Sequence, residues 1–465
     1  MYAVECGRTM SDVKDAVAEV KSENARPTVS AVLSDGSVVE LLYRPEERRT
    51  LFCVASDGAY RFEDTLLERE NRLVPFSPGN NLLAHEVVLL PSEPEEYETE
   101  QELVDEIQAF IHRYVDITPV FEQIASYYVL FTWVYDDFNE LPYLRVHGDY
   151  GSGKTRFLLT VGSLCYKPIF ASGASTISPL FRILDLFRGT LIIDECDFRL
   201  SDERAEVVKI LNNGNAKGFP VLRSEVMGKK EFDPRAFSVF GPKLVATRGF
   251  FEDRALESRF ITEEMGQSRL REDIPINLPS TYKTEALHLR NKLLLFRLRT
   301  VGKRHAVADL VDRTIEPRLN QIFVPLLSII DDSRARDDLR ALARRYNREA
   351  IADRGMEMDA QVLETIRDLH AASIDGKVSV KDVASWFADK HGEEYDRKVT
   401  AKWIGYIIRR KLGLKTQKSR GVFTIALSEK PKIERLYEKY GLVSGDAADR
   451  EAENDQSQPR QPPVG

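Results

Sequence analysis

An apolar run that leads into a glycine-rich turn is the feature that most constrains how this chain folds. Tyr143–Val146 favours a buried strand, and the eight residues after His147 combine three glycines with a final lysine and threonine. Glycines let backbone N–H groups approach a phosphate, and a helix that starts beside them directs its positive dipole end to the same point. The pattern predicts a P-loop between a strand and a helix. Its residues are Gly148, Asp149, Tyr150, Gly151, Ser152, Gly153, Lys154 and Thr155.

The end of this loop and a second apolar run predict a site for ATP and Mg²⁺. Lys154 is expected to reach the β- and γ-phosphate oxygens, and Thr155 to bind Mg²⁺ through its hydroxyl. Thr190–Ile193 is followed by two acids, of which Asp194 would hold the Mg²⁺ shell and Glu195 would act as general base. Many strands end in acids, so this second pattern alone would be weak evidence for a magnesium site. It becomes strong evidence because a P-loop lies upstream of it.

Composition places the chain among soluble proteins with several domains. The 465 residues are 43% hydrophobic and 30% charged, with a net charge of -8, and we expect three or four domains. The N-terminus lacks the apolar core of a signal peptide, and the most apolar stretch, 124–135, is short for a membrane span. The cysteines form no CxxC pair, which argues against zinc and disulfides; we expect a cytoplasmic protein. They are Cys6, Cys53, Cys165 and Cys196.

The predicted secondary structure differs between the N-terminal and central parts of the chain. Asp35-Gly36 and Asp57-Gly58 each separate two β-prone runs, so residues 26–90 predict a small β-rich domain, most simply a packing or oligomerisation module. Residues 141–268 alternate short apolar runs with helical stretches, which predicts an α/β fold with a parallel sheet. The expected strands are Tyr143–Val146, Pro168–Ala171, Thr190–Ile193, Lys243–Ala246 and Phe260–Thr262.

Two further segments resemble the AAA+ ATPase family. The segment 241–248 is similar to the strand that carries sensor 1, with Thr247 at its polar end, where many relatives have Asn. The segment 253–260 resembles the one that ends in the family's arginine finger, which implies that Arg259 is the finger and Arg254 the second choice. The alternative for Arg259 is an ion pair with a nearby acid, such as Glu263 or Glu264.

Two more sites follow from the same resemblance. Arg318, after Pro317, lies where the family places sensor 2 in its lid helices. The segment between the two acids and sensor 1 is similar to the presensor hairpin of the helicase branch, which includes superfamily III and minichromosome maintenance helicases. In that branch such hairpins grip nucleic acid; the alternative is an ordinary surface hairpin. The candidate contacts are Lys217, Phe219, Lys229 and Lys230.

The C-terminal region reads as a winged helix with a basic face. Residues 376–440 contain 16 Lys and Arg against 8 Asp and Glu, which is the charge segregation typical of a nucleic-acid-binding module. Winged helices also bind proteins, so that alternative stays open. The candidate DNA contacts are Lys398, Lys402, Arg409, Arg410, Lys411, Lys415, Lys418 and Arg420.

Together these features predict an AAA+ motor that acts on DNA as a ring, most simply a hexamer, similar to replication helicases of mobile elements. Two alternatives remain: an ATP-dependent DNA-binding switch without unwinding, and a defence or signalling ATPase with a protein partner. The expected domains are a β-rich domain (1–92), an acidic linker with helices (93–140), the ATPase core (141–268), a helical lid (269–355), the winged helix (356–442) and a disordered tail (443–465).

Overall fold

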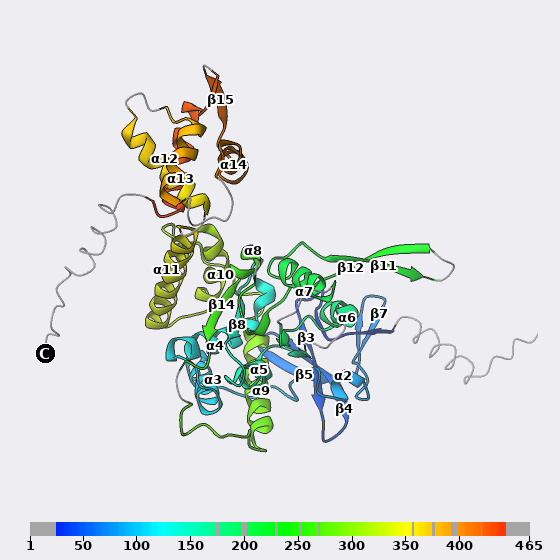
Figure 1. Cartoon of the computed structure of the whole chain (residues 1–465). Coiled ribbons are helices and arrows are strands. Elements are labelled where there is room, and N and C mark those ends of the chain that lie inside the picture. Colours follow the sequence, from blue (N-terminus) through cyan, green and yellow to red (C-terminus); the bar gives the residue numbers. More distant parts are fainter. Residues whose placement is uncertain are drawn as a thin grey trace, which may run out of the picture. The chain divides into compact units, whose positions relative to one another are not determined.

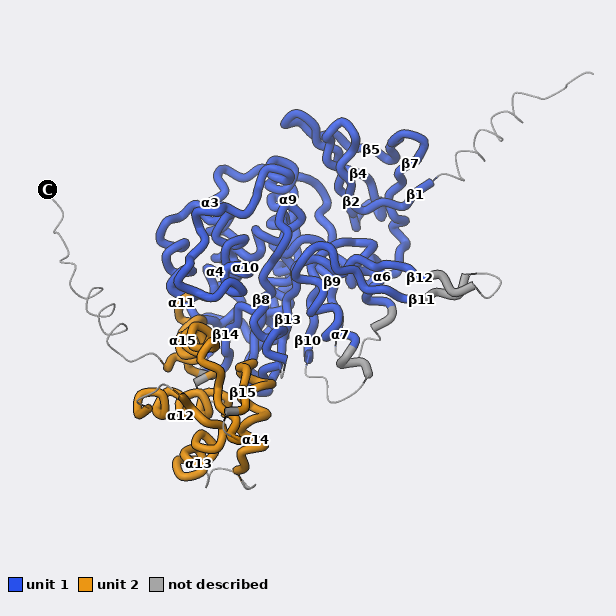
Figure 2. The backbone as a smooth tube through the Cα atoms, turned by 90° about the horizontal axis from the view of Figure 1, so that it is seen from above, with its two compact units in different colours: residues 1–343 blue, residues 344–465 orange. Residues whose placement is uncertain are grey.

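The chain forms two compact units, residues 1–343 and 344–465 (Figure 2). The computed structural model describes residues 25–172, 177–196, 202–227, 231–251, 253–267, 270–355, 358–373, 377–391, 399–419 and 421–442. The tail 443–465, expected to be disordered, therefore lies outside the described residues. Within the described ranges no helix is both long and apolar enough to span a bilayer.

A five-stranded parallel sheet forms the centre of the first unit (Figure 1), which confirms the α/β fold predicted from the sequence. The strand order is β14-β8-β13-β10-β9, and every neighbouring pair is parallel. Each strand begins and ends within two residues of the predicted run. The bounds are β8 Tyr143–His147, β9 Ile169–Ser172, β10 Leu191–Asp194, β13 Lys243–Thr247 and β14 Phe260–Glu264.

Helices flank this sheet because every residue of β8 and β13 is buried, so both faces need cover. Local signals set some of the helix starts: the Thr99 hydroxyl accepts a hydrogen bond from the Glu102 amide at the start of α3, and α4 begins with Pro119. The helices of this unit are α2 Asn81–Ala84, α3 Glu100–Tyr114, α4 Pro119–Thr132, η1 Tyr135–Asp137, α5 Lys154–Leu164, α6 Ile177–Phe187, α7 Asp202–Asn213, α8 Arg254–Glu257, α9 Tyr282–Thr300, η2 Ala308–Leu310 and α10 Pro317–Leu327, with α11 Ser333–Gly355 running into the second unit.

The N-terminal part is β-rich, as predicted, and both Asp-Gly pairs lie between antiparallel strands. Asp57 and Gly58 have φ of 53° and 81°, the left-handed conformation that a tight hairpin turn requires. The strands form two sheets, ordered β2-β3-β4-β5 and β1-β7-β6. Their bounds are β1 Ala25–Pro27, β2 Ser30–Val32, β3 Val38–Arg44, β4 Arg49–Ser56, β5 Ala59–Glu63, β6 Leu66–Glu68 and β7 Asn71–Val74.

A long antiparallel hairpin stands between β10 and β13, where a presensor hairpin was expected. Its strands are β11 Val221–Met227 and β12 Glu231–Phe237, which pair over their full length. In Figure 1 the hairpin projects away from the central sheet. The residues of its tip, which include Lys229 and Lys230, lie outside the described residues.

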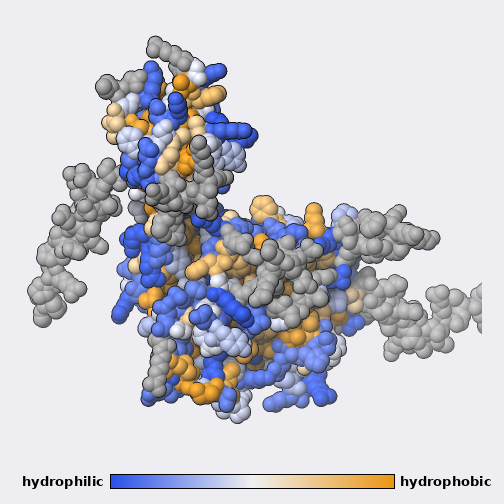
Figure 3. All heavy atoms as spheres, in the orientation of Figure 1, coloured by the Kyte–Doolittle hydropathy of each residue, from blue (hydrophilic) through white to orange (hydrophobic). Residues whose placement is uncertain are grey.

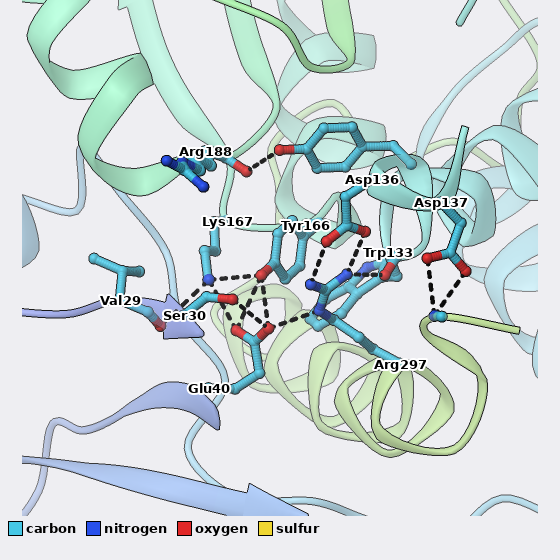
Figure 4. A network of polar contacts seen from close by, with 12 residues as sticks. Val29, Ser30, Glu40, Trp133, Asp136, Asp137, Tyr166, Lys167, Arg188 and Arg297 are labelled. Carbon is cyan, nitrogen blue, oxygen red and sulfur yellow. Dashed lines mark hydrogen bonds and ion pairs between the residues drawn. The ribbon is translucent and has the colours of Figure 1, made fainter. Parts of the chain in front are cut away.

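One buried carboxylate joins the N-terminal sheet to the central sheet and its helices (Figure 4). Glu40 of β3 accepts from Lys167, directly before β9, at 2.8 Å and from Arg297 of α9 at 2.6 Å. All three side chains are at most 2% exposed. Burial raises the pKa of Glu40, but the charges of Lys167 and Arg297 outweigh it, so the net pKa falls below its usual value.

The same network continues toward the base of the hairpin. Arg297 also binds the Asp136 carboxylate at 2.7 Å, and Lys217 donates to the Asp136 carbonyl at 2.6 Å. Lys167 shares Glu40 with Arg297, so burial, together with the repulsion from Arg297, lowers the pKa of Lys167 to about 8 despite the nearby acid. The N-terminal sheet, the central sheet and α9 are thus linked by one set of buried charges, and the exposed Lys217 joins the hairpin base to it through the backbone of Asp136.

In the described part of the second unit, α12, α13 and α14 precede a two-stranded hairpin, and α15 follows it. The unit's own apolar core includes Leu363, Phe387, Ile404 and Ile425. The winged-helix assignment stays a prediction. The elements are α12 Met358–Ala372, α13 Val380–His391, α14 Ala401–Tyr406, the π-helical turn η4 Ile407–Lys411, β15 Thr416–Ser419, β16 Val422–Ile425, η5 Leu427–Glu429 and α15 Lys430–Lys439.

We expect Glu40→Ala to lower the free energy of unfolding of the first unit by about 3–5 kcal/mol, because it leaves two cations buried without their shared acid. Glu47→Ala is the matched control: its carboxylate lies 3.4 Å from Arg44 but is 51% exposed, so the loss should stay below about 1 kcal/mol. Urea titration followed by fluorescence of Trp133, in a background where Trp386 and Trp403 of the second unit are replaced by Phe, would measure both. Equal losses for the two variants would contradict the stabilising role of the network.

Candidate nucleotide site

The order of the central sheet brings the predicted nucleotide residues to one edge. Because the strands are parallel, the carboxyl ends of β8, β13 and β10 lie side by side, with β13 in the middle. The P-loop follows β8 and leads into α5, whose first residue is Lys154. Gly151 and Gly153 have φ of 79° and 91°, so the loop uses the backbone freedom that only glycine offers cheaply.

The two predicted magnesium ligands are in contact. The Thr155 hydroxyl donates to the Asp194 carboxylate at 2.6 Å, which joins the start of α5 to the end of β10 across the sheet edge. Lys154 turns back onto its own loop, where its ammonium donates to the carbonyls of Gly148 at 2.8 Å and Asp149 at 2.7 Å. A hydroxyl and a carboxylate oxygen beside a lysine form a donor set that suits Mg²⁺ and phosphate.

Thr247 lies at the end of β13, between these two groups. Its carbonyl accepts from the Gly148 amide at 3.3 Å, so the strand that bears Thr247 is joined to the first glycine of the loop. Its side chain is 1% exposed, and within the described residues its hydroxyl has no hydrogen-bond partner. A buried hydroxyl without a hydrogen-bond partner costs free energy. Because Thr247 lies between the P-loop and Asp194, a ligand bound there could provide the missing partner.

Glu195, the expected general base, follows Asp194 in a left-handed conformation with φ of 53°. Such a φ is strained for a residue other than glycine and is often found at functional sites. The Glu195 carboxylate lies 3.8 Å from the guanidinium of Arg248, which in turn lies 5.9 Å from the centre of the Tyr150 ring. Sequence reasoning missed Arg248, although its position directly after Thr247 at a strand end was an available signal.

Close packing fixes the shape of the loop. An added Cβ on Gly148, whose φ is 153°, would lie 2.5 Å from the carbonyl oxygen of Met265, directly after β14. An added Cβ on Gly162 of α5 would lie 2.5 Å from Ile192 of β10. The loop and its helix can therefore lie against β14 and β10 only because these positions lack side chains.

A buried arginine ties the predicted finger segment to the P-loop strand. Arg145 of β8 is fully buried and binds Glu257 of α8 at 2.8 Å and the Thr262 hydroxyl at 3.1 Å. Its guanidinium also lies 5.2 Å from the ring centres of Phe250 and Phe260. Because Arg145 is held on several sides, α8 keeps a fixed place relative to the strand that precedes the loop.

Arg259 is not brought to the P-loop of its own chain. It precedes β14, and its carbonyl accepts from Tyr143 at the beginning of β8, whereas the P-loop follows the other end of that strand. The four residue steps from Tyr143 to His147 span roughly 13 Å. The Arg259 side chain is 9% exposed and donates to Asn215 at 2.9 Å and Asn212 at 2.6 Å, rather than pairing with the acids of β14.

Arg318 lies at the same edge as Arg259 and is likewise not over the nucleotide site of its own chain. It contacts the Ser258 hydroxyl at 3.4 Å and Gln321 at 3.0 Å. Burial and, next, the nearby charge of Arg318 lower the pKa of Arg259, which indicates two guanidinium groups close together. Arg254 of α8, the second choice for the finger, is exposed. We call Arg254, Arg259 and Arg318 the arginine edge.

The predicted DNA contacts lie outside the nucleotide site. Lys217 is held at the hairpin base through Asp136, while Phe219 is 66% exposed. Arg420, Lys398, Lys229 and Lys230 lie outside the described residues. The remaining basic candidates of the second unit are all exposed: Lys402, Arg409, Arg410, Lys411, Lys415 and Lys418.

No protein-family model and no curated protein matches this chain. Among solved structures, the apo C-terminal region of NrS-1 is 12% identical, with a TM-score of 0.37 over 83% of this chain and 96% of that one. A structure described as the active helicase Cch of SCCmec type IV is 9% identical, with a TM-score of 0.41 over 91% and 84%. A homologue of MCM from Methanopyrus kandleri is 11% identical, with a TM-score of 0.34 over 64% and 68%. These likenesses concern the fold alone.

We expect Gly148→Ala to destabilise the first unit by about 2–5 kcal/mol, because its Cβ meets the Met265 carbonyl and its φ is unfavourable for alanine. Gly151→Ala is the control within the same loop: an added Cβ there meets nothing within 4 Å, so only the cost of its φ remains, about 1–2 kcal/mol. Chemical denaturation without nucleotide would measure the difference. The opposite ranking would contradict the packing argument.

Proposed function

We propose that this chain is an ATPase that couples hydrolysis to movement on DNA, working as a ring. The observation that carries the proposal is the contact between Thr155 and Asp194 at 2.6 Å, with Lys154 in the adjoining loop. A phosphate cradle, a magnesium ligand pair and a following carboxylate are the parts that ATP hydrolysis requires at one place.

Each residue of the site then has one role. ATP is the proposed substrate, and a Mg²⁺ ion held at this site would neutralise the charge of its phosphates. Lys154 holds the terminal phosphates, and Thr155 and Asp194 hold the metal shell. Glu195 accepts the proton of the attacking water, and Thr247 donates its otherwise unpaired hydroxyl to the phosphate or the water.

The arginine edge supports assembly into a ring. Arg259 and Arg318 place two positive charges close together at the edge opposite the P-loop, where the phosphate site of a second copy can meet them. The AAA+ resemblance makes a hexamer the simplest ring. Arg259 would have to give up its hydrogen bonds to Asn212 and Asn215 to reach a neighbour, whereas Arg254 is already exposed.

DNA is the proposed polymer because basic residues cluster in the second unit of an otherwise acidic chain. The exposed candidates there include Lys402, Arg410 and Lys415, and cation clusters of this kind bind phosphate backbones. The β11–β12 hairpin offers a second contact surface through Phe219 near its base. We further propose that the chain displaces DNA strands while it moves.

We expect the wild-type chain to displace a strand from forked DNA in the presence of ATP and Mg²⁺. Lys154→Ala should lose ATP binding, because the phosphates lose their point charge. Glu195→Gln should still bind ATP but hydrolyse it roughly 10²–10⁴-fold more slowly, since an amide cannot accept the water's proton. A phosphate-release assay and a strand-displacement assay on the same preparations measure both activities.

Glu272→Gln provides the control, because this exposed acid lies outside the site. A Glu195→Gln rate within about threefold of wild type would place the general base elsewhere. Normal hydrolysis without strand displacement would favour the nucleotide-dependent DNA-binding switch over a motor.

We expect Arg259→Ala to lower turnover by up to about 10³–10⁵-fold, with nucleotide affinity largely preserved, if its guanidinium acts on a neighbour's phosphate. Arg254→Ala and Arg318→Ala, tested in parallel, identify which member of the arginine edge acts. Mixing Arg259→Ala chains with Lys154→Ala chains should restore some activity, because an intact Lys154 can then face an intact Arg259 in one interface.

Arg299→Ala is the surface control, because its ion pair is with the exposed acid Glu96 and its guanidinium otherwise lies over the ring of Tyr97. The thermal stability of Arg259→Ala should be measured alongside, since that side chain also has hydrogen bonds within its own chain. Failure of proven mixed assemblies to regain activity would argue for a structural role of Arg259 within one chain.

A further inference from the structure

The segment from Val399 to Ser428 has an unusual charge composition. It contains seven basic residues and no acidic residue, although the chain as a whole carries a net charge of -8. It covers α14, η4 and the β15–β16 hairpin. In Figure 3 hydrophilic residues predominate on the visible surface of this unit, with separate apolar side chains among them.

One exposed aromatic ring lies in the middle of this basic segment. Lys402, Tyr406 and Arg410 follow one another at helical spacing along α14 and η4, so they share one side. The side opposite to them packs into the core through Ile404 and Ile408. Tyr406 is 54% exposed, although a tyrosine ring gains from burial.

A second exposed ring lies on the hairpin. Phe423 of β16 is 50% exposed and stands opposite Lys418 of β15. Alternate residues of a strand share a face, so Phe423 lies on the same face as Ile425, which packs into the core. That face is turned to η4, because Thr416, paired with Ile425, accepts from Arg409 at 3.5 Å.

We propose that the C-terminal unit binds DNA whose bases are unpaired, with Tyr406 and Phe423 as stacking platforms within the basic surface. Phosphate binding alone needs only cations, and in an intact duplex the faces of the bases are covered by their neighbours. Exposed rings among cations are the combination that holds single strands. No acidic residue lies between Val399 and Ser428. A surface with cations alone suits a polyanion better than a protein surface that carries charges of both signs.

This inference rests on the proposed DNA binding by the second unit, and it specifies that the bound DNA is single-stranded. The test uses the full-length chain without ATP and measures fluorescence anisotropy with a labelled oligothymidine strand and with a blunt duplex of equal length. Tyr406→Ala and Phe423→Ala should each weaken binding to the single strand roughly 5- to 150-fold, the loss expected for one stacked base. Binding to the duplex should change less than about threefold, because stacking does not contribute there.

Two further variants keep the two claims apart. The double variant Arg410→Ala with Lys411→Ala should weaken both DNAs, since phosphate contacts do not distinguish them. If it weakens neither, the proposed DNA binding by this unit is wrong. If it weakens both while the aromatic variants act equally on the two DNAs, or on neither, only the stacking proposal is wrong.

Conservative and neighbouring substitutions control for folding. Tyr406→Phe and Phe423→Tyr should keep the single-strand affinity of the wild type, because each retains a ring. Val422→Ala removes a side chain that is 40% exposed on the other face of the same strand, and it should leave both affinities unchanged. A loss for Tyr406→Phe and Phe423→Tyr as large as for the alanine variants would overturn the assignment of stacking to the rings.

Discussion

The burial of Glu40 between two cations is the interaction on which the arrangement of the first unit depends. A carboxylate that is 1% exposed can stay ionised only beside opposite charges, so Lys167 and Arg297 must lie within reach of it. Those two residues come from the start of β9 and from α9, which are far apart in the sequence. This pairing holds the N-terminal sheet, the edge of the central sheet and the hairpin base in fixed positions relative to one another.

The candidate nucleotide site depends on the order of the strands in the central sheet. The hydrogen bond between Thr155 and Asp194 joins α5, which follows β8, to the end of β10, and β13 lies between those two strands. Thr247 is placed between the phosphate cradle and the acids by the same ladder. The conformation of the loop follows from its own residues. The site, however, needs the sheet to bring together residues about 40 positions apart in the chain, such as Thr155 and Asp194.

What could be predicted from the sequence was what short segments determine. The strands of the central sheet and the two Asp-Gly turns follow from local apolar runs and turn chemistry, and the contact of Thr155 with Asp194 agrees with the shared magnesium role predicted from two separate motifs. The partners of Arg259 could not be predicted, because Asn212 and Asn215 reach it only through the packing of α7 on α8. Glu40 gave no signal either: an acid in an apolar strand looks solvent-facing until its partners are known. The roles of Arg259 and Arg318 stay predictions.

The separation of the P-loop from the arginine edge gives each chain a direction. One end carries the phosphate cradle and the other carries the cations, so a contact that joins them is head-to-tail and relates two different surfaces. A dimer with two-fold symmetry can make that contact twice only where both surfaces lie in its single interface, whereas here Arg259 and the P-loop lie at opposite ends of β8. An assembly built on the proposed contact either closes into a ring or continues as a helical filament, and only closure gives every chain the same neighbours. The rotation from one chain to the next therefore decides whether the assembly closes. In an assembly that stays open, the site at its end has no partner.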